Sequence, residues 1–152
     1  MLWMLLPAGI FAADEKIKKK AESWEEKEPP RKMFGGRIIL QKLHNQGAAL
    51  SFMRQTPKVL TFVTTAVTAG ITLSYVRLKA DGGNLLLKSG TGMILGGAWS
   101  NVWDRIHRGY VVDYFSFRSK YEEIQNIVFN LSDMFIFFGG ILVIFWNMLR
   151  KS

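Results

Sequence analysis

Three long apolar runs constrain the fold of this chain more strongly than any other feature. They cover Val59–Val76, about Leu85–Trp103 and about Ile127–Leu149. Each run approaches the roughly 20 residues that an α-helix needs to cross the hydrocarbon core of a bilayer. With 152 residues and 49% hydrophobic content, the chain has room for one domain. The sequence therefore predicts a single polytopic membrane domain over residues 1–152.

The N-terminal segment Met1–Ala13 permits two interpretations. It is short for a membrane span and contains Pro7, so a cleaved signal peptide is one of them. However, a basic region before the apolar part is missing, and no clean small-x-small cleavage site precedes Asp14. We therefore expect an uncleaved helix over about residues 1–20, which makes the fold an all-α bundle of four transmembrane helices. Four lysines are expected to reach toward the membrane surface: Lys16, Lys18, Lys19 and Lys20.

The predicted topology gathers the polar residues on one side of the membrane. Because four crossings joined by short turns place alternate connections on opposite sides, the end of the first span shares a side with the start of the second. The end of the third span and the start of the fourth lie there too. The polar residues at these ends are Asp14, Asn45, Asn101, Asp104, Arg105, Asp113, Asn130 and Asp133. Residues 37–43 and 48–52 are expected to form a small β or loop platform at that surface.

Composition narrows the chemistry and the partners. The chain has no cysteine, which excludes disulfides, thiol nucleophiles and cysteine metal sites. His44 and His107 are far apart and lack metal-ligand spacing, so we expect no metal. No phosphate-binding glycine loop appears, and we expect no other cofactor. The net charge of +8 raises nucleic acid as a partner, but the basic residues are mixed with glutamates beside the spans. Membrane lipids with anionic headgroups are the expected counter-charge, with no nucleic acid.

Two aspartates at the edges of consecutive apolar segments carry the strongest functional signal. Asp113 lies in the run Gly-Tyr-Val-Val-Asp-Tyr-Phe, where removal from water should raise its pKa, and Asp133 opens the last span. A carboxylate at membrane depth costs about 2.5–3.5 kcal/mol or more, so each needs a paired or functional explanation. Two such acids could share one proton and activate a water molecule, which is the chemistry of aspartyl proteases.

Two further groups of polar residues permit a functional and a structural interpretation. Asn101, Asp104 and Arg105 share one helical face, where Arg105 could hold a carboxylate or a peptide carbonyl. Alternatively, they are helix-end charges that face water. Asn130 could orient the Asp133 carboxylate, or it could cap a helix whose first turn favours an acid. The glycines of Gly92-x-x-x-Gly96-Gly97 indicate close helix packing.

Five ordered blocks give the chain a resemblance to the lipoprotein signal peptidases (signal peptidase II) over nearly its whole length. The blocks are Ala12-Ala13-Asp14 with Lys18, Asn45-Gln46-Gly47-Ala48-Ala49, Leu95-Gly96-Gly97-Ala98-x-x-Asn101-x-x-Asp104-Arg105, Gly109-Tyr110-Val111-Val112-Asp113 and Phe129-Asn130-x-x-Asp133. The chain departs from the family pattern at Glu15, Ser100 and Ser132, where glutamine, glycine and alanine are usual.

The resemblance implies a monomeric aspartic endopeptidase of the bacterial inner membrane. Such an enzyme cuts the signal peptide from diacylglyceryl-modified prolipoproteins before the lipidated cysteine. Asp113 and Asp133 would be the catalytic pair, supported in substrate binding by Asp14, Lys18, Asn45, Asn101, Asp104, Arg105 and Asn130. The active face would point outward, although 15 of the 20 Lys and Arg residues lie on that side, which by the positive-inside rule would place it in the cytoplasm.

Two other classes of function stay open at the level of sequence. A catalytically inactive homologue that binds signal peptides would keep the helices and the platform, but it should tolerate Asp113→Asn. A small proton-coupled transporter should place acids at mid-bilayer or on both sides of it, whereas here they cluster on one side.

Overall fold

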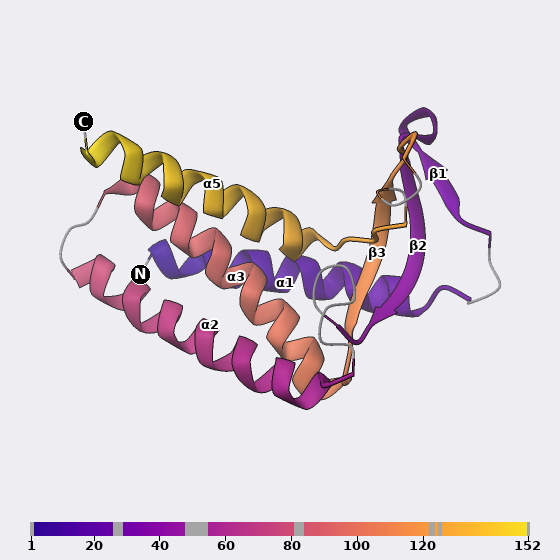
Figure 1. The fold of residues 1–152 in the computed structure, drawn as a ribbon, viewed down its shortest axis with the longest axis horizontal. Coiled ribbons are helices and arrows are strands. Elements are labelled where there is room, and N and C mark those ends of the chain that lie inside the picture. Colours follow the sequence, from indigo (N-terminus) through magenta and orange to yellow (C-terminus); the bar gives the residue numbers. More distant parts are fainter. Residues whose placement is uncertain are drawn as a thin grey trace.

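A computed structural model describes residues 2–25, 29–47, 55–80, 84–121, 124 and 126–151. Four long helices dominate this part of the chain, as predicted: α1 (Leu2–Glu22), α2 (Pro57–Ala80), α3 (Leu85–His107) and α5 (Leu131–Lys151). They run alongside one another in alternating directions, and a small sheet lies at one end (Figure 1). The end of α1, the start of α2, the end of α3 and the start of α5 all meet at the sheet end. The predicted gathering of these four ends is therefore confirmed for the bundle (Figure 1), whereas their place on one side of a membrane stays a prediction.

Helix α3 is the central helix, because it packs against α1, α2 and α5. The glycines of α3 allow the neighbouring helices to approach it closely. A Cβ on Gly96 would lie 2.7 Å from the Pro7 carbonyl oxygen, and a Cβ on Gly97 would lie 2.5 Å from the Ser132 carbonyl oxygen. Real Cβ atoms do not approach backbone so closely, so only glycine permits these helix contacts. The predicted packing face is confirmed.

The last helix begins four residues later than the sequence suggested. The predicted span started at about Ile127, whereas α5 starts at Leu131. The Asn130 side-chain oxygen accepts a hydrogen bond from the Asp133 backbone N–H (2.9 Å), which is an N-cap. The preceding Phe129 is extended instead, and its backbone exchanges hydrogen bonds with Phe115 at 2.7 and 3.0 Å.

Three antiparallel strands form the predicted platform in the order β1 (Arg31–Met33), β2 (Ile38–Asn45) and β3 (Val111–Phe117). The pairing sets Leu43 opposite Asp113 and Asn45 opposite Val111. The ladder between β2 and β3 is irregular between Leu40 and Leu43. The prediction of a platform from residues 37–43 is confirmed, whereas its second part, residues 48–52, lies outside the described residues.

The distribution of polarity is the reverse of that in a water-soluble domain. Large apolar side chains are exposed on the outer faces of α2 and α5, among them Phe62, Leu73, Phe137 and Ile144. In contrast, Asp14, Lys18, Asp104, Asn130 and Ser132 are fully buried. In the described residues, two segments are long and apolar enough to cross a membrane, Pro57–Leu78 and Leu131–Arg150. The crossing of the membrane by the four helices stays a prediction.

A substitution at the closest helix contact tests this packing. Gly97→Ala should lower the free energy of unfolding by about 1–3 kcal/mol, because the new methyl group meets backbone of α5 that cannot move aside. Thermal unfolding of the purified protein in detergent measures the effect. Gly140→Ala is the matched control, since a Cβ there meets nothing within 4 Å. Equal Tm values for the two variants would contradict the packing argument.

Candidate active site

The two aspartates predicted as a pair line one cavity of about 360 Å³. Asp113 comes from β3 and Asp133 from the first turn of α5. Asn45 from β2 also lines the cavity. The rest of the lining is apolar: Val111, Ile127, Val128, Phe129, Met134, Ile136 and Phe137. Two carboxyl groups from separate segments thus share one space with an otherwise apolar wall.

Asn130 bridges the two aspartates. Its side-chain Nδ2 donates to Asp113 Oδ1 (2.7 Å), and its backbone N–H donates to Asp133 Oδ2 (3.1 Å). Together with the bond from the Asp133 N–H to Asn130 Oδ1, this is a reciprocal capping box. The two interpretations of Asn130 are therefore not exclusive: the residue caps α5 and orients the acid pair.

Two more asparagines complete the contacts of the pair. Asn45 Nδ2 donates to Asp113 Oδ2 (2.9 Å), and Asn101 Nδ2 donates to Asp133 Oδ1 (3.0 Å). Asn130 Nδ2 also lies 3.1 Å from Asn101 Oδ1. Each of the four carboxylate oxygens thus accepts a hydrogen bond from an asparagine. The orientation of both carboxyl groups is fixed before any substrate binds.

Burial changes the acidity of this pair. Removal from water, and next the negative charge of Asp133, raise the pKa of Asp113 from 3.8 to about 7. Hydrogen bonds from Asn45 and Asn130 oppose this shift, because they favour the charged form. As predicted, the pKa of Asp113 lies above its ordinary value. The site is therefore able to hold a proton near neutral pH.

A fully buried ion cluster lies behind the pair. Lys18 Nζ contacts Asp14 Oδ2 and Asp104 Oδ2, both at 2.9 Å, and all three side chains have 0% exposure. Lys18 also donates to Asn101 Oδ1 (3.0 Å). The expectation that Lys18 reaches toward the membrane surface is wrong, because two carboxylates compensate its charge inside the protein.

The end of α3 supplies the remaining predicted residues. Asp104 does not face water: it accepts a hydrogen bond from the Val112 backbone N–H (3.1 Å) and also pairs with Arg108. Arg105 donates to the backbone oxygens of Asn101 and Gly47, both at 3.2 Å. Among the described residues its buried Nε has no acceptor. Arg105 thus connects the end of α3 to Gly47.

The comparisons with known proteins agree with this geometry. The sequence profile of the family described as "Signal peptidase (SPase) II" matches residues 6–149. The chain belongs to the signal peptidase II family. The lipoprotein signal peptidase of Caldicellulosiruptor bescii is 30% identical over 100% of this chain and 93% of the relative. That of Moorella thermoacetica is 32% identical, with 100% and 95% covered. Membership of the family implies a protease.

The fold is also that of known structures. A solved structure described as a bacterial membrane enzyme superposes with a TM-score of 0.84 over 99% of this chain and 90% of that chain, at 19% identity. A second structure with the same description has a TM-score of 0.78, covers 99% of this chain and 94% of that chain, and is 18% identical.

The structure places all nine predicted site residues of this signal peptidase II in one connected region. Sequence reasoning flagged Glu15, Ser100 and Ser132 only as departures, and it missed Tyr114 and Arg108. All five are part of the buried network: Glu15 pairs with Arg108 (3.3 Å), and Ser100, Ser132 and Tyr114 bind Asp14. The spacing of Arg108 four residues after Asp104 was the available signal for an ion pair.

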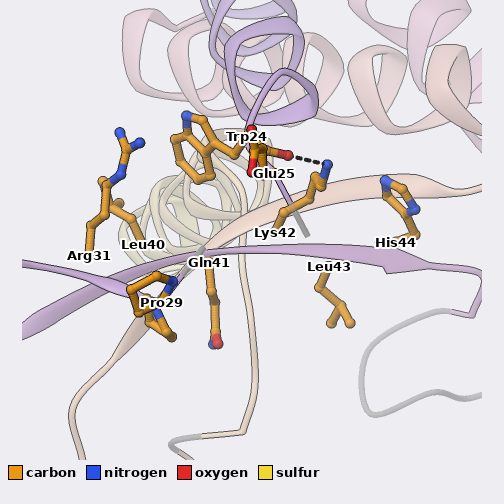
Figure 2. A pocket seen from close by; sticks show the side chains of 10 residues that line it. Trp24, Glu25, Pro29, Arg31, Leu40, Gln41, Lys42, Leu43 and His44 are labelled. Carbon is orange, nitrogen blue, oxygen red and sulfur yellow. Dashed lines mark hydrogen bonds between the residues drawn. The ribbon is translucent and has the colours of Figure 1, made fainter. Parts of the chain in front are cut away.

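A second cavity, of about 430 Å³, lies on the platform between the end of α1 and β2. Lys42 and His44 extend to one side of β2, and Lys42 reaches toward Trp24, whose backbone oxygen it contacts at 2.6 Å (Figure 2). Among the residues that the structure describes, this cavity shares no lining residue with the one that holds Asp113 and Asp133. It is polar, and the acid pair is not part of it.

The raised pKa of Asp113 predicts a pH dependence of stability. A carboxyl whose pKa rises on folding binds its proton more tightly in the folded state. The free energy of unfolding should therefore fall as the pH rises from about 4 to about 7. In Asp113→Asn this fall should be smaller, as measured by Tm in detergent across that range. Glu25→Gln, at an exposed carboxyl, is the control. Identical pH curves for the wild type and Asp113→Asn would contradict the burial of a charge.

Proposed function

We propose that this signal peptidase II is an aspartic endopeptidase that removes the signal peptide of diacylglyceryl-modified prolipoproteins before the lipidated cysteine. The observation that carries the proposal is the acid pair itself, Asp113 and Asp133, bridged by Asn130 in one cavity. The relatives supply the substrate, because those of C. bescii and M. thermoacetica are lipoprotein signal peptidases.

The pair performs the hydrolysis with one shared proton. Two neighbouring carboxyl groups that do not both ionise readily retain one proton between them near neutral pH. The ionised member takes a proton from water while the water oxygen attacks the scissile peptide carbonyl. The protonated member gives its proton to the carbonyl oxygen. In the second step the protonated member gives its proton to the leaving nitrogen, and the other member takes a proton from a hydroxyl of the tetrahedral intermediate. The C–N bond breaks, and the pair is left with one proton again.

The surroundings suit an apolar substrate. The wall formed by Phe129, Met134, Ile136 and Phe137 accepts the side chains of a signal peptide or the acyl chains of the lipidated cysteine. Arg105 supports the site from outside this cavity, because it donates to the backbone oxygens of Asn101 and Gly47. We assign Asn45 and Asn101 to the orientation of the acids rather than to substrate, because their amide N–H groups already bind Asp113 and Asp133.

In this proposal the chain is a single membrane domain that acts as a monomer in the bacterial cell membrane. All four helices cross the bilayer, and the sheet with the acid pair lies at the outer surface. The apolar outer faces of α2 and α5 support contact with lipid. The buried polar cluster supports the crossing of α1 and α3, since their charges are paired inside the protein.

Cleavage of a lipid-modified prolipoprotein by the purified protein tests the proposal. Asp113→Asn and Asp133→Asn should each lower kcat by on the order of 10²–10⁴-fold, because each removes one half of a general acid–base pair. Ser116→Ala, at a fully buried residue of β3 that binds Gln41 in the platform, is the control and should keep full activity. Retained cutting by either asparagine variant would overturn the assignment. Binding without cutting by the wild type would instead favour an inactive homologue.

A further inference from the structure

Asp14 is held by four hydrogen-bond donors from three other elements and its own helix. Its Oδ2 accepts from Lys18 Nζ (2.9 Å), Ser100 Oγ (2.7 Å) and Ser132 Oγ (2.5 Å). Its Oδ1 accepts from the Tyr114 hydroxyl (2.8 Å). Asp14, Ser100 and Ser132 have 0% exposure. One buried carboxylate thus connects α1, α3, β3 and α5, which meet beside the sheet (Figure 1).

Two of these donors are the chain neighbours of the catalytic candidates. Tyr114 directly follows Asp113, and Ser132 directly precedes Asp133. Since side chains alternate along a strand, Tyr114 points to the opposite face of β3 from Asp113 and reaches the buried Asp14. Ser132 likewise holds the first turn of α5 against α1. The hydrogen bonds of Tyr114 and Ser132 to Asp14 therefore constrain the distance between Asp113 and Asp133, in addition to the bridge through Asn130.

The Tyr114 hydroxyl also links Asp14 to the start of α5. It donates to Asp14 and accepts a hydrogen bond from the Leu131 backbone N–H (2.8 Å), the first residue of α5. Burial and the negative charge of Asp14 raise the pKa of the Tyr114 hydroxyl, so the group stays a neutral donor. A phenylalanine would fill the same space but would connect neither Asp14 nor Leu131.

We propose that Tyr114 and Ser132 are positioning residues that set the separation of Asp113 and Asp133 through their shared acceptor, Asp14. This inference rests on the proposed function of the acid pair. It goes beyond the pair and its asparagines, because it assigns a role in catalysis to two hydroxyl groups that do not contact the substrate cavity. A misplacement of about 1 Å can cost on the order of 10²-fold in rate, so a small change in this spacing should be measurable.

Two substitutions that remove only the hydroxyl groups test the proposal. In Tyr114→Phe and Ser132→Ala we expect kcat with a lipid-modified prolipoprotein to fall about tenfold or more, with KM within about twofold. In the double variant the loss should be smaller than the product of the single losses, because both hydroxyls act through Asp14. Tyr110→Phe and Ser116→Ala are the controls, since neither hydroxyl binds Asp14.

A second readout separates positioning from general stabilisation. If the acids move apart, the repulsion that contributes to the pKa of Asp113 weakens. The midpoint of an infrared titration of the carboxyl groups, measured without substrate, should then move down by at least half a pH unit in Tyr114→Phe and Ser132→Ala. A loss of rate that follows Tm alone, with an unchanged titration, would show a merely structural role and overturn the proposal.

The two readouts also distinguish this inference from the proposed function. If the wild type does not cut a prolipoprotein but the titration midpoint still moves in both variants, the proposed function fails and the positioning role stands. If the wild type cuts, and neither kcat nor the midpoint changes in Tyr114→Phe and Ser132→Ala, the positioning role is wrong and the proposed function stands.

Discussion

The ion pairs of the buried Lys18 ammonium group with Asp14 and Asp104 are the interactions on which the rest of the site depends. A charged side chain with no exposure is tolerated only with charges of opposite sign and hydrogen bonds around it, and Lys18 has both in Asp14 and Asp104. Because Asp14 and Lys18 belong to α1 and Asp104 to α3, this pairing requires the two helices to meet in one register. The close approach at Gly96 permits that register.

Lys18 also determines how the amides behind the acids are oriented. An ammonium only donates, so the Asn101 oxygen must face it and the Asn101 NH₂ group must face Asp133. The same oxygen lies next to the Asn130 NH₂ group, which donates to Asp113. A buried charge thus fixes the direction of hydrogen bonds to both acids, although it contacts neither of them.

The residues at which the chain departs from the family pattern are not scattered over the structure. Ser100 and Ser132 place hydroxyl groups on the same oxygen of Asp14, and the carboxylate of Glu15 pairs with Arg108. Arg108 in turn pairs with Asp104, which binds Lys18. These three residues therefore belong to one polar network. The hydrogen bonds of Asp14 in this network connect α1 and α3 to β3, which carries Asp113, and to α5, which carries Asp133.

The sequence by itself determined the approximate course of the helices, the end of the bundle at which their polar residues gather and the unusual setting of Asp113. Apolar run length and local charge are read directly from the chain. It did not determine the start of α5, since the Asn130 cap and the pairing of Phe129 with Phe115 override an apolar run. Only the tertiary structure decided that Lys18 turns inward and that Tyr114 and Ser132 meet at Asp14. Their partners are distant in the chain, and local patterns carry no information about which distant groups will compensate a buried charge.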